Sequence, residues 1–193
     1  MKNRFEDRQG YFSSVSILRH IDAEGSDRSA AIIASGAAED YLRVCLDLFF
    51  SGMSEANVRT ASKEKQLNRE LYEGYGPLSS FSAKILFLYA LGVISEEGKS
   101  ELQIIKNIRN IFAHDVSDAR FSREDIGRQC DNLCSWELML SNEYIKIRHK
   151  DKEITRRDKF VYSSIGMMTK VSIHTLEKIS AIKKKDHIDN ASS

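Results

Sequence analysis

Proline is almost absent from this chain of 193 residues, which has one proline and ten glycines. Proteins built from many short strands need more of both residues at their turns, so this scarcity argues against a β-sandwich or a β-barrel. No apolar run reaches the roughly 18–20 residues that cross a bilayer as a helix. The amino-terminal segment MKNRFEDRQG is polar and contains acidic residues, unlike a secretory signal peptide. We therefore expect an all-α protein that stays in the cytoplasm without membrane contact.

The chain also lacks an excess of charge of one sign. It has 29 Lys and Arg residues and 28 Asp and Glu residues, so its formal net charge is +1. Neither a uniformly basic nucleic-acid binder nor a disordered polyelectrolyte fits this balance. Segment 146–185 is nevertheless basic, with 12 basic and 4 acidic residues. It is either the solvated side of a final helix or a surface for RNA phosphates, with the RNA contacts made by Arg156, Arg157, Lys183, Lys184 and Lys185.

Cysteine is scarce, and the three cysteines are Cys45, Cys130 and Cys134. An odd number without the paired spacing of a zinc site indicates reduced thiols in a cytosolic protein. Cys130 and Cys134 lie four residues apart on one face of a predicted helix, but zinc needs two more ligands and none is near them. We therefore expect buried apolar thiols, no metal and no cofactor; metal or redox chemistry is the alternative.

Apolar residues recur at three- and four-residue steps and predict helices. Ser26 and Ser95 stand where two of the helices begin, and their hydroxyls can act as N-caps. Segment 55–72 is polar and predicts an exposed helix or an ordered loop, and segment 143–156 predicts a charged connector with a brief extended piece. The predicted helices cover residues 5–20, 27–50, 81–94, 96–114, 122–140 and 157–182. They form one domain over residues 1–193, a bundle of six to seven helices with a frayed tail at 186–193.

The spacing also predicts the core. Helix 27–50 is expected to be central, and segment 81–94 is apolar almost all round, with Lys84 as its one charge, which predicts burial on most sides. In the helix after it, Leu102, Ile105, Ile108 and Phe112 form an apolar stripe. The buried residues expected from helix 27–50 are Ile33, Ala37, Tyr41, Val44 and Leu48.

Common enzymatic motifs are missing, because the chain has no glycine-rich phosphate loop, no GxSxG turn and no HExxH. The segment IKNIRNIFAHD instead places Arg109, Asn110 and His114 at the end of an otherwise apolar helix. These polar groups need partners if they are buried. Either they cap the carbonyls of this helix end, or they bind and cleave a phosphodiester without metal, since Arg grips phosphate and His transfers protons.

Arg109-Asn110-x-x-x-His114 resembles the Arg, polar residue, His motif of the HEPN superfamily. These are small all-helical domains, and many are metal-independent ribonucleases or toxins. Two protomers pair, and their Arg and His residues line a shared cleft where RNA is cut by its own 2′-hydroxyl. The resemblance implies a homodimer in which Arg109 holds the scissile phosphate, His114 acts as general acid or base, and Asn110 orients either of them.

The run GYGPLSSFSAKILFLYALGVISEEGKSELQIIKNIRNIFAHD at 74–115 is similar to the core of the mannitol operon repressor family, and segment 27–46 fits the helix that precedes that core. This second resemblance implies an all-helical regulator that acts through protein partners and does not read DNA directly. We therefore expect an endoribonuclease or toxin that acts on RNA, with an antitoxin as its partner; the alternative is a non-catalytic transcriptional regulator.

Overall fold

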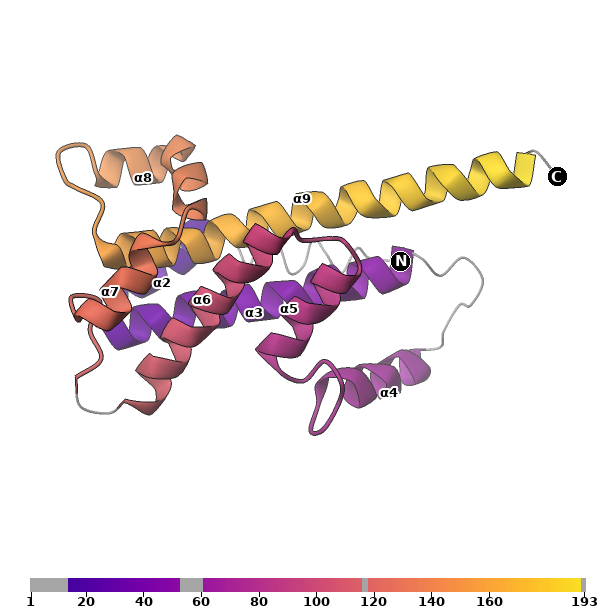
Figure 1. The fold of residues 1–193 in the computed structure, drawn as a ribbon, viewed down its shortest axis with the longest axis horizontal. Coiled ribbons are helices and arrows are strands. Elements are labelled where there is room, and N and C mark those ends of the chain that lie inside the picture. Colours follow the sequence, from indigo (N-terminus) through magenta and orange to yellow (C-terminus); the bar gives the residue numbers. More distant parts are fainter. Residues whose placement is uncertain (1–13, 53–60, 116–117, 192–193) are drawn as a thin grey trace. The chain divides into compact units, whose positions relative to one another are not determined.

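The computed structural model describes residues 14–52, 61–115 and 118–191 (Figure 1). All regular elements of these ranges are helical, which confirms the predicted all-α class. None of these helices is long and apolar enough to cross a membrane. The elements are α2 (Ser14–Glu24), α3 (Asp27–Gly52), α4 (Ala61–Tyr72), α5 (Phe81–Ala90), α6 (Glu96–His114), α7 (Glu124–Asp131), the 3-10 helix η1 (Ser135–Ser141), α8 (Glu143–Arg148) and α9 (Arg156–Ala191).

The chain forms two compact units. The first unit consists of Met1–Ala38 and Glu101–Met167, and the second consists of Glu39–Ser100 and Met168–Ser193. The unit boundaries fall within α3, α6 and α9, so each of these helices contributes residues to both units. That the whole chain acts as a single domain remains a prediction.

Serine hydroxyls begin two of the helices as the sequence predicts. Ser26 Oγ accepts a hydrogen bond from the main-chain N–H of Ser29 at 3.0 Å, and Ser95 Oγ accepts one from Gly98 at 3.2 Å. Each hydroxyl satisfies an amide that has no partner within its own helix. Both N-caps are thus confirmed.

The core of the first unit is built around α6. Its side chains at Leu102, Ile105, Ile108 and Phe112 are fully buried, as the spacing predicts. The ring of Phe121 lies between two other rings, 4.8 Å from that of Phe112 and 5.3 Å from that of Phe160. This packing fixes the carboxyl-terminal half of α6, where the candidate site lies.

α3 buries a different face from the predicted one. Among the expected core positions only Val44 is buried, while the other four are partly exposed. The α3 residues buried most completely in the first unit are alanines, at Ala30, Ala31, Ala34 and Ala38. Alanine allows a neighbouring helix to approach closely, so the part of α3 in the first unit buries small side chains, whereas Leu42 and Leu46 of the same helix are large side chains buried in the second unit.

The prediction that α5 is buried on most sides was wrong. Leu86 and Phe87 are 59% and 42% exposed, whereas Lys84 is only 5% exposed. The ammonium of Lys84 lies 2.8 Å from Glu39 Oε1, and this ion pair compensates the charge for its burial. The lysine therefore faces the interior of the second unit, and part of the apolar surface faces solvent.

The single helix predicted over 122–140 was also wrong. The chain leaves helical geometry after α7 and resumes as η1, so Cys130 and Cys134 do not share a helix face. Gly166 of α9 lies against the main chain of Ser135, and a Cβ at residue 166 would collide with the Ser135 carbonyl oxygen. Close approach of α9 thus accompanies the break between α7 and η1.

Several helix boundaries differ from the predicted ones. The expected connector at 143–156 contains α8, which begins where the Asn142 side chain accepts a hydrogen bond from the Tyr144 N–H at 3.0 Å. α9 continues to Ala191, because no glycine or proline follows Gly166. Residues 186–191 are therefore helical rather than frayed. The parts of the first predicted helix at 5–13, of the polar segment at 55–60 and of the tail at 192–193 lie outside the described residues.

Candidate functional site

The residues singled out from the sequence lie in the last two turns of α6. Arg109 and Asn110 are half-buried, and Arg109 Nη1 donates a hydrogen bond to Asn110 Oδ1 at 3.1 Å. His114 is the last residue of the helix, and its side chain is exposed. Within the described part of the chain, the His114 side chain makes no hydrogen bond or ion pair. The structure thus brings Arg109 and Asn110 together and leaves His114 facing solvent.

The carbonyls at this helix end are capped by Arg28, which sequence reasoning missed. Arg28 lies in the first turn of α3, and its guanidinium donates hydrogen bonds to the main-chain oxygens of Phe112 and Asp115. The sequence did contain one indication of this role. A cation in the first turn of a helix is disfavoured by the helix dipole, so Arg28 needs a compensating partner. Since Arg28 caps the helix, Arg109, Asn110 and His114 are not needed for that purpose.

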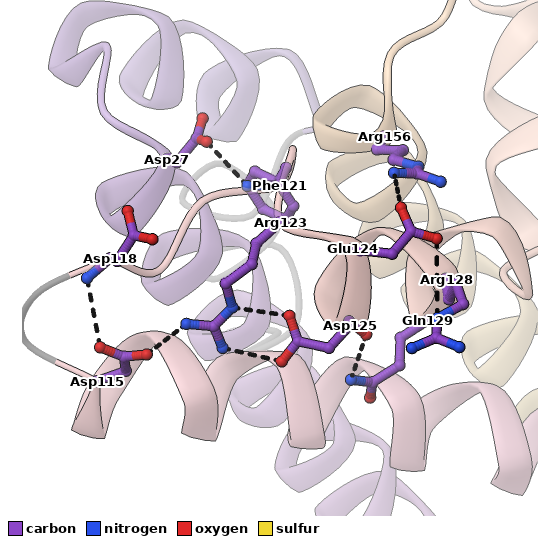
Figure 2. Close-up of polar contacts among 10 residues, drawn as sticks. All are labelled: Asp27, Asp115, Asp118, Phe121, Arg123, Glu124, Asp125, Arg128, Gln129 and Arg156. Carbon is purple, nitrogen blue, oxygen red and sulfur yellow. Dashed lines mark hydrogen bonds and ion pairs between the residues drawn. The ribbon is translucent and has the colours of Figure 1, made fainter.

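A second arginine holds the residue that follows His114. The Arg123 guanidinium forms an ion pair with Asp115 Oδ2 and two hydrogen bonds with Asp125, at 2.7 and 3.0 Å (Figure 2). Asp125 and then Asp115 raise the pKa of Arg123, and Arg123 in turn lowers the pKa of Asp125. Asp27 Oδ2 accepts a hydrogen bond from the Phe121 N–H at 3.0 Å. These contacts tie the connection after α6 to α3 and to the start of α7.

The basic residues expected to contact RNA are engaged within the first unit or lie in the second. Arg156 donates to Asp131 Oδ2 at 2.8 Å and lies 3.5 Å from Glu124, and its side chain passes over Gly127, where a Cβ would collide with it. Arg157 donates to the Gly25 carbonyl at 3.0 Å. Both arginines therefore have partners that a phosphate would have to replace.

The remaining basic residues of that prediction lie near the carboxyl end of α9. Lys183 and Lys184 are exposed and belong to the second unit. The side chain of Lys185 lies outside the described residues. A surface that joins all five residues to one RNA strand remains a prediction.

The cysteines divide into two groups. Burial raises the pKa of the Cys45 and Cys130 thiols to about 12. Cys134 is exposed, contrary to the prediction, and its Sγ lies 3.4 Å from Glu101 Oε2. In the ranges that the structure describes, no three His, Cys, Asp or Glu side chains are grouped to hold a metal ion.

Glu101 is a further polar residue that sequence reasoning missed. Its side chain is only 4% exposed, and it accepts hydrogen bonds from the N–H of Cys134 at 3.0 Å and from the N–H and hydroxyl of Ser135 at 2.7 and 2.5 Å. The carboxylate thereby caps η1. Glu101 lies one turn before Ile105, in line with the apolar stripe of α6. Helical spacing alone therefore indicated that this carboxylate is buried.

Comparison with known proteins identifies a family. The family model described as "Mannitol repressor" matches residues 65–179, more than half of the chain. No curated protein and no solved structure matches significantly. The matched segment contains Glu101, Arg109, Asn110 and His114, and Arg28 precedes it. The chain belongs to the mannitol repressor family.

Proposed function

We propose that this protein is a transcriptional regulator that acts through a protein partner and does not read DNA itself. The observation that carries the proposal is the match to the mannitol repressor family over residues 65–179. A formal net charge of +1 also argues against unaided binding to the phosphate backbone, whose affinity depends on many cationic contacts.

The end of α6 supports this proposal. Arg28 caps the helix carbonyls and Arg123 holds Asp115, so the polypeptide is well fixed there. Arg109 and His114 take no part in either network. A helix end that is held in this way and exposes His114 suits recognition of another protein, because little main-chain flexibility is lost on binding.

The experiment separates regulation from DNA binding. A reporter gene under a mannitol operon promoter is expressed in a host that lacks its own copy of the regulator, with and without this protein. We expect lower reporter expression with the protein, and no retardation of the same promoter fragment by the pure protein in a gel. Unchanged reporter expression would refute a regulatory role at this promoter, and retardation of the fragment would show direct DNA binding instead.

Metal-independent cleavage of RNA is a second candidate function. The contact of Arg109 with Asn110, one turn before an exposed His114, is the observation that favours it. In this function Arg109 holds the scissile phosphate, His114 transfers protons, and Asn110 orients the phosphate or the histidine. Two copies of the helix end would have to meet in a two-fold dimer to provide both a proton donor and an acceptor.

The ribonuclease function is tested with pure protein and mixed RNA in EDTA. Cleavage by 2′-hydroxyl attack gives products with 2′,3′-cyclic phosphates, and both His114→Ala and Arg109→Ala would abolish it while the helical circular-dichroism spectrum stays unchanged. Light scattering reports in parallel whether the mass is about twice the 22.0 kDa of one chain. Intact RNA with the wild-type protein, or a monomer, would leave regulation as the function.

A further inference from the structure

We propose that the outward face of α6 in the first unit is the surface that receives the protein partner, and that the partner presents carboxylate side chains to it. The inference rests on the proposed regulatory function and adds the place and the chemistry of the contact. The face, hereafter the α6 polar face, consists of Gln103, Lys106, Asn107, Arg109, Asn110 and His114.

The position of this face follows from the burial of its helix. The stripe of α6 that ends with Phe112 is fully buried, and the opposite side carries Gln103, Asn107 and His114, all exposed. Lys106 flanks that side, whereas Arg109 lies at the border with the buried stripe and reaches toward the face through its hydrogen bond to Asn110; both are half-buried. No described residue covers the exposed positions, so the face is open to a partner.

Charge on the face is of one sign. The segment from Leu102 to His114 contains no Asp or Glu. Its cationic side chains are Lys106 and Arg109, and its carboxamide side chains are Gln103, Asn107 and Asn110. The acidic residues of the helix, Glu96, Glu97 and Glu101, all lie before this segment; Glu96 pairs with Lys99 at 2.8 Å and Glu101 is buried against η1. The α6 polar face therefore offers hydrogen-bond donors and positive charge without an acid of its own.

Arg109 differs from other arginines of the first unit. Arg123, Arg148 and Arg156 each form an ion pair with an aspartate. Arg109 is half-buried, but its hydrogen-bond partner is the neutral amide of Asn110, and no carboxylate in the described ranges pairs with it. A guanidinium that has lost part of its hydration gains most from a carboxylate, which it binds through two parallel hydrogen bonds.

The surroundings favour separate carboxylates over a continuous polyanion. The residues that follow the helix include Asp115, Asp118, Glu124 and Asp125, with Arg120 and Arg123 as the basic residues between them. The arginines in this direction are already paired with these carboxylates, so they offer a nucleic-acid strand leaving the α6 polar face no free cations for its next phosphates. A protein partner places its carboxylates only opposite Lys106 and Arg109, so it needs no further cations.

The test uses synthetic probes with the full-length protein. One probe is a short helical peptide with a row of glutamates, its control is the same peptide with glutamines, and the third probe is single-stranded oligouridylate. Each is titrated into isotope-labelled protein, and binding is followed by amide chemical shifts and fluorescence anisotropy. We expect the glutamate peptide alone to bind, with the shifted amides at residues 103–114.

Charge reversal identifies the side chains. Arg109→Glu and Lys106→Glu should each weaken binding of the glutamate peptide about tenfold or more, and Arg109→Gln should have a smaller effect in the same direction. The matched control is Arg69→Glu, which reverses an exposed arginine of α4 in the second unit and should leave binding unchanged. Equal weakening by Arg69→Glu, or shifted amides outside residues 103–114, would overturn the assignment.

The reporter assay separates failure of this surface from failure of the proposed function. If the wild-type protein lowers reporter expression, Arg109→Glu should relieve that effect and Arg69→Glu should not. Full repression by a folded Arg109→Glu protein would refute the α6 polar face and leave the regulatory function intact. Binding of oligouridylate but not of the peptide at residues 103–114 would assign the face to RNA, and an unresponsive reporter together with peptide binding would refute only the regulatory function at that promoter.

Discussion

Arg28 and Phe112 are 84 residues apart in the chain, and the guanidinium of the first donates a hydrogen bond to the main-chain oxygen of the second. The same guanidinium also reaches the carbonyl of Asp115. Carbonyls in the last turn of a helix have no partner within the helix. One side chain of α3 therefore completes the end of α6, on which Arg109, Asn110 and His114 depend for their position.

Replacing Arg28 by alanine should destabilise the protein. The variant loses two charged hydrogen bonds and leaves a partly buried helix end uncapped, so we expect the free energy of unfolding to fall by about 2 kcal/mol. Arg28→Lys should recover only part of this, because an ammonium lacks the planar fork that reaches two carbonyls. Urea unfolding followed by circular dichroism measures the change. The control Arg19→Ala, at an exposed position of α2, should have almost no effect; equal losses at both positions would contradict the capping role.

Gly166 should tolerate no side chain. A Cβ there would collide with the carbonyl oxygen of Ser135 and lie 3.2 Å from the Ser135 Cβ, so Gly166→Ala should cost about 1–3 kcal/mol. Gly36 in α3 is the matched control, since a Cβ at that position meets no atom within 4 Å. Gly36→Ala should stabilise the protein by up to about 1 kcal/mol through helix propensity. Thermal unfolding of the two variants checks the opposite signs, and a stabilised Gly166→Ala protein would show that α9 and η1 are less closely packed.

Acid should remove the contribution of Asp131 to stability. Hydrogen bonds from Arg156 and Lys159 lower the pKa of this carboxyl in the folded protein. A lowered pKa in the folded state means that the stabilisation is complete above the ordinary Asp pKa of about 3.9 and is lost as the pH falls through the folded value. The melting temperature of wild type should therefore exceed that of Asp131→Asn at neutral pH and approach it in acid.

The matched control for that titration is Asp151→Asn, at an exposed position. Because the Asp151 side chain makes no ion pair or hydrogen bond within the described ranges, its replacement should change the melting temperature little at neutral pH. A difference between wild type and Asp131→Asn that grows toward low pH would contradict the lowered pKa.

The three thiols should react at different rates. Cys45 and Cys130 are buried and have pKa values raised to about 12, so almost no thiolate is present at pH 8, whereas Cys134 is exposed. A maleimide reagent should label one cysteine of the folded protein quickly, and peptide mapping should place the label on Cys134. Cys134→Ser should abolish the fast reaction, and all thiols should react in denaturant. Fast labelling of Cys45 would show that its helix opens readily.

Local signals in the sequence predicted local features well. The hydroxyls of Ser26 and Ser95 act within four residues of themselves, and the apolar stripe from Leu102 to Phe112 follows helical spacing, so both were predictable. The prediction of one helix over 122–140 failed because the chain after the helix break is held by Glu101, which caps η1 from more than thirty residues away.

The candidate site shows the same difference between local features, which were predicted, and contacts between distant residues, which were not. The sequence placed Arg109, Asn110 and His114 together at a helix end, but it did not predict which side chain caps that end. The cap that Arg28 provides and the buried ion pair of Lys84 were not predicted, because their partners, the Phe112 carbonyl and Glu39, are distant in sequence. Spacing along one helix contains no information about such partners.

The hydrogen bonds that Glu101 accepts also have a consequence for the order of folding. η1 is a 3-10 helix of seven residues, too short to persist without tertiary support. Its first amides find their acceptor only after the chain has closed a loop of 34 residues back to α6. We therefore expect η1 to form after α6 has docked, and we expect exchange of the Ser135 amide proton with solvent to follow the opening of α6 rather than the fraying of η1.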